Sequence, residues 1–243
     1  MGSGVKHMIA TVINSVLILI GSFAGLFFRN KIKESYLNAI VMGIGLCVMV
    51  VGIDSALSSN DTLCVIICMA LGIIIGELLR IEERLQQLGE VLKAKFSKKD
   101  SNSRFTEGFM AATLLFAIGS MAILGSLEAG INQDYSILLS KSVMDCLMAI
   151  GFAAAMGIGV AFSAIPIFLY QGGLTLLAGV VAPYLSDALI AEMSGVGGVI
   201  IIGLSINILG LLGDRHVRTG NMLPAIFLPV LYLPIAEWLG GIL

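Results

Sequence analysis

Eight long apolar stretches follow one another along the chain, separated by shorter polar segments. Each comes close to the roughly 20 apolar residues that one crossing of a bilayer requires. Because a segment in lipid must satisfy its own backbone hydrogen bonds, each stretch is predicted to be a helix. The pattern predicts an all-α, polytopic transmembrane helical bundle of about eight helices, or seven if residues 137–184 do not form two full spans. The approximate limits of the stretches are 9–28, 36–57, 63–79, 106–127, 137–162, 165–184, 191–213 and 222–242.

The composition strengthens this prediction. Hydrophobic residues make up 58% of the 243 residues and charged residues only 12%, whereas an ordinary soluble domain has about 25% charged residues. The mean hydropathy of +1.00 is too high for a solvated surface. A formal net charge of -2 offers no basic surface to nucleic acid. These numbers exclude a soluble enzyme, a nucleic-acid reader and a disordered protein, and they make the lipid bilayer the first expected partner.

The basic residues predict an orientation. Twelve of the 14 lysines and arginines fall between stretches one and two, three and four, or seven and eight. The connections from even to odd stretches carry acidic residues instead. Because positively charged loops remain in the cytoplasm, the odd-to-even connections are predicted to be cytoplasmic and both termini to lie outside.

One polar segment divides the chain. Residues 1–7 read as a cloning remnant before a native start at Met8. Residues 8–80 and 105–243 are predicted to form two transmembrane parts, of about three and about five helices. Between them, residues 81–104 carry leucines at helical spacing, which predicts an amphipathic cytoplasmic helix that lies on the leaflet or acts as a plain linker. An offset of 73 residues pairs four identical residues, which fits either an internal duplication or chance.

Polar side chains mark the fourth and fifth stretches. Lys141 and Asp145 are four residues apart and therefore share one face of the fifth helix. One interpretation is that the two charges neutralise each other as an ion pair. The alternative is that Asp145 faces a wet vestibule just inside the outer surface, where it binds a cation or carries a proton. Ser120 and Ser126 of the fourth stretch would assist it.

The sixth stretch is predicted to be short and interrupted. Pro166 lies near its start, Tyr170 and Gln171 are followed by two glycines, and Thr175 lies one turn further on. Segments interrupted by glycine and proline often mark transporter binding sites, although a packing turn or re-entrant turn without a ligand gives the same pattern. We predict that Gln171 lies at the end of a half-helix and faces protein or water.

Three further features concern packing. Three prolines, Pro224, Pro229 and Pro234, predict a kinked last helix. Asn14 and Asn207 lie inside the first and seventh stretches. A buried asparagine usually bonds to another helix, so we favour packing over ligand binding for both, while Asn207 stays among the candidate ligands. Glycine pairs at GxxxG spacing predict close helix approaches at Gly21 and Gly25, and at Gly72 and Gly76.

At these residues a family resemblance emerges. The chain resembles the bacterial YdfK/YqgA-type membrane proteins from about Met8 to its C-terminus. The resemblance implies a multi-pass protein of the bacterial inner membrane, at most a candidate transporter, from a family labelled as a domain of unknown function. It implies no agreed substrate and no catalytic residues. The segments that carry the resemblance are 119–128, 141–145, 163–172 and 220–224.

We therefore expect a small secondary transporter or ion-conducting protein with a polar site between helices four, five and six. The competing hypothesis is a non-transporting sensor or scaffold that acts through residues 81–104. We expect no enzyme activity, no cofactor and no metal, since the chain has only two histidines and its four cysteines lie in apolar runs. A small ion or metabolite and a second copy of the chain are further expected partners. The candidate ligands are Asp145, Gln171, Tyr170, Thr175, Ser120, Ser126 and Asn207.

Overall fold

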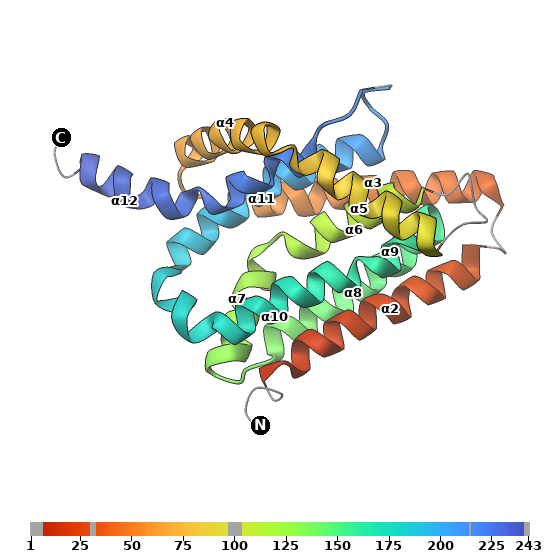
Figure 1. Cartoon of the computed structure of the whole chain (residues 1–243), viewed down its shortest axis with the longest axis horizontal. Helices are drawn as coiled ribbons and strands as arrows, with labels where there is room; N and C mark the ends of the chain where they lie inside the picture. The colour runs from red at the N-terminus through yellow and green to blue at the C-terminus, as the bar shows by residue number, and fades with distance from the viewer. Residues whose placement is uncertain (1–6, 30–32, 97–103, 214, 241–243) are drawn as a thin grey trace.

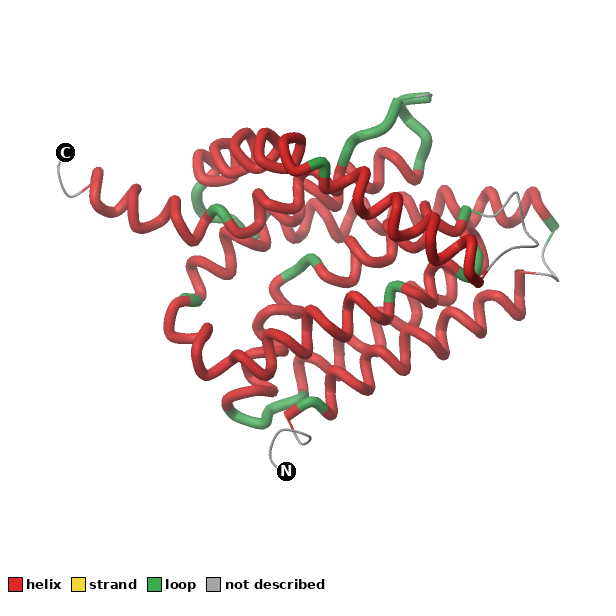
Figure 2. The backbone as a smooth tube through the Cα atoms, viewed as in Figure 1, coloured by secondary structure: helices red, strands yellow, loops and turns green. Residues whose placement is uncertain are grey.

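The computed structural model of the protein describes residues 7–29, 33–96, 104–213 and 215–240, and within these ranges it consists of helices joined by turns and loops, with no strand (Figure 2). The elements in order are α2 (Ile9–Arg29), α3 (Glu34–Ala56), α4 (Thr62–Leu79), α5 (Ile81–Phe96), α6 (Phe105–Ala117), α7 (Ser120–Ile131), α8 (Ser136–Met156), α9 (Gly159–Phe162), α10 (Ala164–Val181), the 3-10 helix η1 (Ala182–Tyr184), α11 (Asp187–Ile208), the 3-10 helix η2 (Thr219–Phe227) and α12 (Pro229–Gly240).

The predicted spans are present. Six helices of the described chain are long and apolar enough to cross a membrane, and two bent pairs, α6 with α7 and η2 with α12, bring the number to eight if each pair is one span. The predicted all-α transmembrane bundle of about eight helices is therefore confirmed. The amphipathic pattern after α4 also forms a helix, α5, over residues 81–96, and residues 97–103 of the predicted segment lie outside the described residues.

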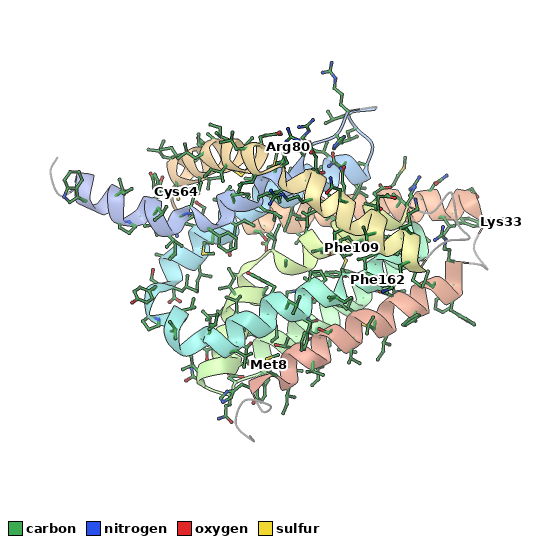
Figure 3. The ribbon with its side chains drawn as sticks, in the orientation of Figure 1. Met8, Lys33, Cys64, Arg80, Phe109 and Phe162 are labelled. Carbon is green, nitrogen blue, oxygen red and sulfur yellow. The ribbon has the colours of Figure 1, made fainter. Side chains whose placement is uncertain are left out.

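The spans run back and forth along one direction, which is horizontal in Figure 1. The ends of α2, α5, α8 and α11 lie toward the right of the view, whereas the start of α2 and the ends of α7, α10 and α12 lie toward the left. Figure 3 shows Lys33 at the right and Met8 at the bottom, near the middle of the view. The connections from odd to even spans thus share one end of the bundle. Which end faces the cytoplasm stays a prediction.

Glycines allow the central helices to approach closely. α2 packs most extensively against α8, and α3 packs against α11. A Cβ atom added at Gly21 would overlap the carbonyl oxygen of Cys146, and one at Gly25 would overlap that of Ile150. A Cβ at Gly76 would overlap the carbonyl oxygen of Asn221, where α4 meets η2. The close approaches that the GxxxG spacing predicts are therefore present.

The fourth span is broken, which the sequence analysis did not predict. α6 ends at Ala117, α7 begins at Ser120, and the two axes differ by 61°. Ile118 is extended and Gly119 has a φ of 121°, a backbone conformation that favours glycine. The hydropathy of the stretch is continuous across this point, and for that reason the pattern indicated one helix.

The sixth span differs from its prediction in the place of its break. Its interruption lies upstream of the expected place, where Gly157 has a φ of 93° and α9 forms a single short turn. α10 then continues without interruption from Ala164 to Val181, so Gln171 lies inside a helix and not at the end of one. Pro166 is tolerated because it occupies the first turn, where its missing N–H has no helical partner. The predicted kink of the last span is confirmed, since η2 and α12 meet at 43°.

Candidate functional site

A buried polar cluster joins α2, α8 and α10. The side-chain nitrogen of Asn14 donates to Asp145 Oδ2 at 3.2 Å and to Gln171 Oε1 at 2.9 Å. Asn14 and Gln171 are fully buried, and Asp145 is 6% exposed. One asparagine thus connects three transmembrane helices, and its predicted role as a contact between helices is present in the structure.

Lys141 completes the charge of this cluster. Its ammonium nitrogen lies 2.5 Å from Asp145 Oδ2, and both side chains are less than a tenth exposed. The same nitrogen lies 6.0 Å from the centre of the Phe116 ring, a distance at which a ring face attracts a cation. Phe116 belongs to the last turn of α6, and the carbonyl end of a helix also favours a positive charge. The predicted ion pair between Lys141 and Asp145 is therefore present, and Asn14 connects it to Gln171.

The cluster lies deep within the spans. Asp145 is the tenth of the 21 residues of α8, and Gln171 is the eighth of the 18 residues of α10. One of the two interpretations of the sequence placed Asp145 just inside the outer surface, whereas the structure places it near the middle of its helix. The predicted fifth stretch extended to residue 162, whereas α8 ends at Met156, so Asp145 falls near the middle of its helix.

Several polar atoms of this region have no hydrogen-bond partner among the described residues. They include Thr11 Oγ1, Asn14 Oδ1, Thr175 Oγ1 and Gln171 Nε2, and all four side chains are at least 97% buried. A buried polar atom without a partner lowers stability by roughly 1–3 kcal/mol. In the described chain, these four atoms lie on α2 and α10, two helices that are joined by the bond between Asn14 and Gln171.

A cavity borders the Lys141–Asp145 pair on the side away from α2 and α10. It has a volume of about 320 Å³ and lies between α3, α8 and the break that separates α6 from α7. Lys141 and Asp145 contribute to its wall, as do Asp54 and Ser55 of α3 and Ser120 at the start of α7. The backbone break of the fourth span therefore borders a cavity, which is where irregular backbone is tolerated at membrane depth.

The other predicted ligands lie apart from this cluster. Tyr170 lines a separate cavity of about 190 Å³ with Ile123 and Met193. Ser126 donates to the carbonyl oxygen of Ala122 in its own helix. Asn207 bonds both backbone groups of Val217, with its Nδ2 donating at 2.8 Å and its Oδ1 accepting at 2.7 Å. Asn207 thus holds the connection after α11.

The structure therefore brings together Asp145, Gln171 and Thr175 of the predicted set, with Ser120 at the cavity wall. It adds Asn14 and Thr11 from the first span, which the sequence analysis left out of the site. The signal that could have included them is their spacing, because positions 11 and 14 lie on one face of α2. The partner of that face is not visible in the local sequence.

Two buried carboxylates outside the cluster hold connections in place. Glu82 at the start of α5 accepts from the backbone N–H of Gly220 at 2.6 Å, while its own N–H donates to Asn221 Oδ1 at 2.7 Å. Burial raises the pKa of Glu82 above its ordinary value, although the Gly220 N–H opposes the shift. Glu192 accepts from Ser59 Oγ at 2.5 Å and from the N–H of Asn60 at 2.8 Å. These contacts are structural, because each satisfies the end of a helix or loop.

Comparison with known proteins supports the resemblance found in the sequence. A family model described as "Protein of unknown function (DUF554)" matches residues 9–233. The "Uncharacterized membrane protein YdfK" of Bacillus subtilis (strain 168) is 33% identical over 226 residues, which cover 91% of this chain and 94% of the relative. The "Uncharacterized protein YqgA" of Escherichia coli (strain K12) is 26% identical over 224 residues, with the same coverage of 91% and 94%. No solved structure matches the chain.

Proposed function

The chain belongs to the family of unknown function DUF554 and is a membrane protein, and we propose that it is a small secondary transporter or ion-conducting protein. Its site would be the cluster of Asn14, Lys141, Asp145, Gln171 and Thr175. The observation that carries the proposal is a buried ion pair in the middle of three apolar helices, next to polar atoms that have no partner. We propose no enzymatic reaction for it.

Stability alone does not account for this arrangement. Removing two charges from water costs several kcal/mol per ion, and well-packed apolar residues of similar volume often stabilise a fold as well or better. Thr11 and Thr175 could be replaced by valine with the same shape and without an unsatisfied hydroxyl group. Charged and polar groups at membrane depth usually mark ion or substrate pathways. The concentration of such groups where α2, α8 and α10 meet therefore favours a ligand.

The cavity beside Lys141 and Asp145 supplies a route to the site. It connects the pair to Asp54, whose side chain is exposed near the end of α3. The break between α6 and α7 lies at the wall of the same cavity. Discontinuous helices next to a charged group at the midplane are a common arrangement in secondary transporters. A cation that enters here would reach the Asp145 carboxylate without crossing lipid.

A thermal-shift screen of the purified, full-length protein tests this proposal. The probes are salts of monovalent and divalent ions and a panel of small metabolites, each titrated in detergent. We expect at least one probe to raise the melting temperature in proportion to the logarithm of its concentration. Asp145→Asn should abolish that response, whereas Asp187→Asn, a change at an exposed position in the first turn of α11, should keep it. A response that Asp145→Asn retains would place the ligand elsewhere, and no response to any probe would contradict the proposal.

A further inference from the structure

We infer that the ligand of this site is a dehydrated monovalent alkali cation of the Na⁺ class, and that its binding moves the Lys141 ammonium group from Asp145 toward Asp54. The inference rests on the proposed function, and it adds the chemical class of the ligand and a role for Asp54. In this account Lys141 is an internal cation that competes with the mobile one. Asp54 is the second anion that Lys141 needs when the mobile cation is bound.

Three of the four unpartnered atoms of the cluster are oxygens, and the fourth is the amide nitrogen of Gln171. α2 and α10 run in opposite directions (Figure 1). The bond between Asn14 and Gln171 shows that these two residues lie at the same depth along the two helices. Thr11 precedes Asn14 by one turn and Thr175 follows Gln171 by one turn, so antiparallel packing brings both threonines to the same level. A Cβ atom added at Gly172 would meet the Met8 side chain at 2.8 Å and the Thr11 methyl group at 3.8 Å, so the first turn of α2 packs against this part of α10.

The resulting set fits an alkali cation. Thr11 Oγ1, Asn14 Oδ1 and Thr175 Oγ1 are oxygens without a hydrogen-bond partner in the described chain, and the Asp145 carboxylate accepts from the side-chain nitrogen of Asn14. Hydroxyl, amide and carboxylate oxygens are the ligands that hard cations prefer. A calcium ion usually takes 6–8 oxygens including several carboxylates, and this cluster has one. A proton would need Asp145 alone and would leave the three oxygens unexplained.

The charge of the cluster requires Lys141 to move. In this structure the positive charge of Lys141 and the negative charge of Asp145 balance. A bound alkali cation would leave one positive charge without a counter-ion in the membrane interior, which is unfavourable. The lysine side chain is long and flexible, so its ammonium group can follow another anion if one lies within reach.

Asp54 is in the right place to be that anion. α3 and α8 pack against each other in opposite directions, and a Cβ atom added at Gly151 of α8 would lie 3.0 Å from the Ile44 side chain of α3. Moving ten residues along each helix from this contact, in the same spatial direction, leads to Lys141 on α8 and Asp54 on α3. Both side chains line the same cavity of about 320 Å³. Packed helices lie about 8–10 Å apart, a gap that a lysine side chain spans.

The test is a titration of the melting temperature with NaCl, in which choline chloride keeps the ionic strength constant. We expect Na⁺ to stabilise the wild type and choline to have no effect. Lys141→Gln removes the competing cation and should lower the Na⁺ concentration at half-effect, whereas Asp54→Asn removes the second anion and should raise it. Each shift should be about tenfold, the change that follows from one charge-assisted contact. Asp187→Asn is the matched control for Asp54→Asn.

Two further variants leave the ion pair intact and address the oxygens. Thr11→Val and Thr175→Val keep the side-chain shape, and each should raise the half-effect concentration of Na⁺ about tenfold. Thr113→Val is the control, because Thr113 also has a buried hydroxyl without a partner among the described residues but lies on α6. These variants test whether the threonine oxygens bind Na⁺ even if Lys141→Gln does not fold.

The outcomes separate this inference from the proposed function. Equal stabilisation by Na⁺ and choline overturns the inference, as does an unchanged half-effect concentration in Asp54→Asn or in both threonine variants. Stabilisation that follows pH and ignores Na⁺ would identify a proton as the ligand, and the proposed ion-coupled function would then stand without this inference. Stabilisation by a metabolite that depends on Asp145 but not on Na⁺ would have the same consequence.

Discussion

At the scale of single residues, Lys141 and Asp145 are both a structural pair and the core of the proposed site. Spacing of four residues was enough to predict that they share a helix face. It did not show that Asn14 of the first span also donates to Asp145, or that the pair lines a cavity. These contacts depend on which helices meet in space, and the local sequence does not contain that information. Tyr170, adjacent to Gln171, illustrates the same limit, because its side chain lines a different cavity.

The ion pair leads to a prediction about stability. Asp145→Asn leaves the Lys141 ammonium group buried without its counter-ion, so we expect a loss of about 3–5 kcal/mol in the free energy of unfolding. The double variant Lys141→Met with Asp145→Asn removes both charges and should recover most of that loss. Unfolding in detergent for the wild type, both single variants and the double variant gives the coupling free energy. A double variant less stable than Asp145→Asn would contradict the assigned pair.

At the scale of elements, the GxxxG spacing and the prolines of the last span predicted packing and kinking because both act locally, whereas the glycines and proline of the sixth stretch predicted a break at the wrong place. The kink of the last span follows from prolines, and the helix approaches follow from residues without a Cβ atom. The break between α6 and α7 could not be predicted in this way. It depends on Gly119 adopting a positive φ next to a cavity, while the hydropathy of the stretch remains continuous.

The close approach of α4 and η2 can be tested with one methyl group. Gly76→Ala would place a Cβ atom against the backbone carbonyl of Asn221, so we expect it to lower the free energy of unfolding by about 1–3 kcal/mol. Gly43→Ala is the matched control, because a Cβ atom there meets nothing within 4 Å. It should leave stability unchanged or slightly higher. Equal stability of the two variants in a denaturation experiment would contradict the described packing.

The contact between α5 and η2 predicts a dependence on pH. Burial raises the folded-state pKa of Glu82 above its ordinary value of 4.5, so the folded protein binds this proton more tightly than the unfolded chain. Stability must then fall as pH rises from about 4.5 through the raised value. We expect Glu82→Gln to flatten this part of the profile of melting temperature against pH. Glu83→Gln, a change at the exposed neighbouring residue, should keep the wild-type slope, and an identical slope in Glu82→Gln would refute the assignment.

At the scale of the whole molecule, hydropathy alone was sufficient to predict the class and the number of spans. Each span must be apolar over the thickness of the bilayer, so every span is visible in the sequence as a run of apolar residues. The positions of the spans relative to one another were not predictable. α2 pairs with α8, and α3 with α11, through side-chain and backbone fit between distant segments. The sequence therefore predicted a polar site between helices four, five and six, and it did not predict that Asn14 of the first helix bonds to Asp145 and Gln171.

The orientation predicted from charge has a direct test. A cysteine introduced at Asn60, in the connection between α3 and α4, should react with an impermeant thiol reagent added outside intact cells. A cysteine introduced at Ser101, between α5 and α6, should not react until the cells are opened. The four native cysteines must first be replaced. The opposite labelling pattern would reverse the predicted placement of both termini.

The most direct test of the central claim is ion flux into vesicles that contain the purified protein. Sodium uptake and internal pH are recorded for the wild type and for the variant that carries both Lys141→Met and Asp145→Asn. We expect cation entry above that of protein-free vesicles for the wild type, and none for the double variant, although its fold should remain stable. A double variant that conducts like the wild type, or a wild type that conducts no more than empty vesicles, would refute a cation pathway through Lys141 and Asp145.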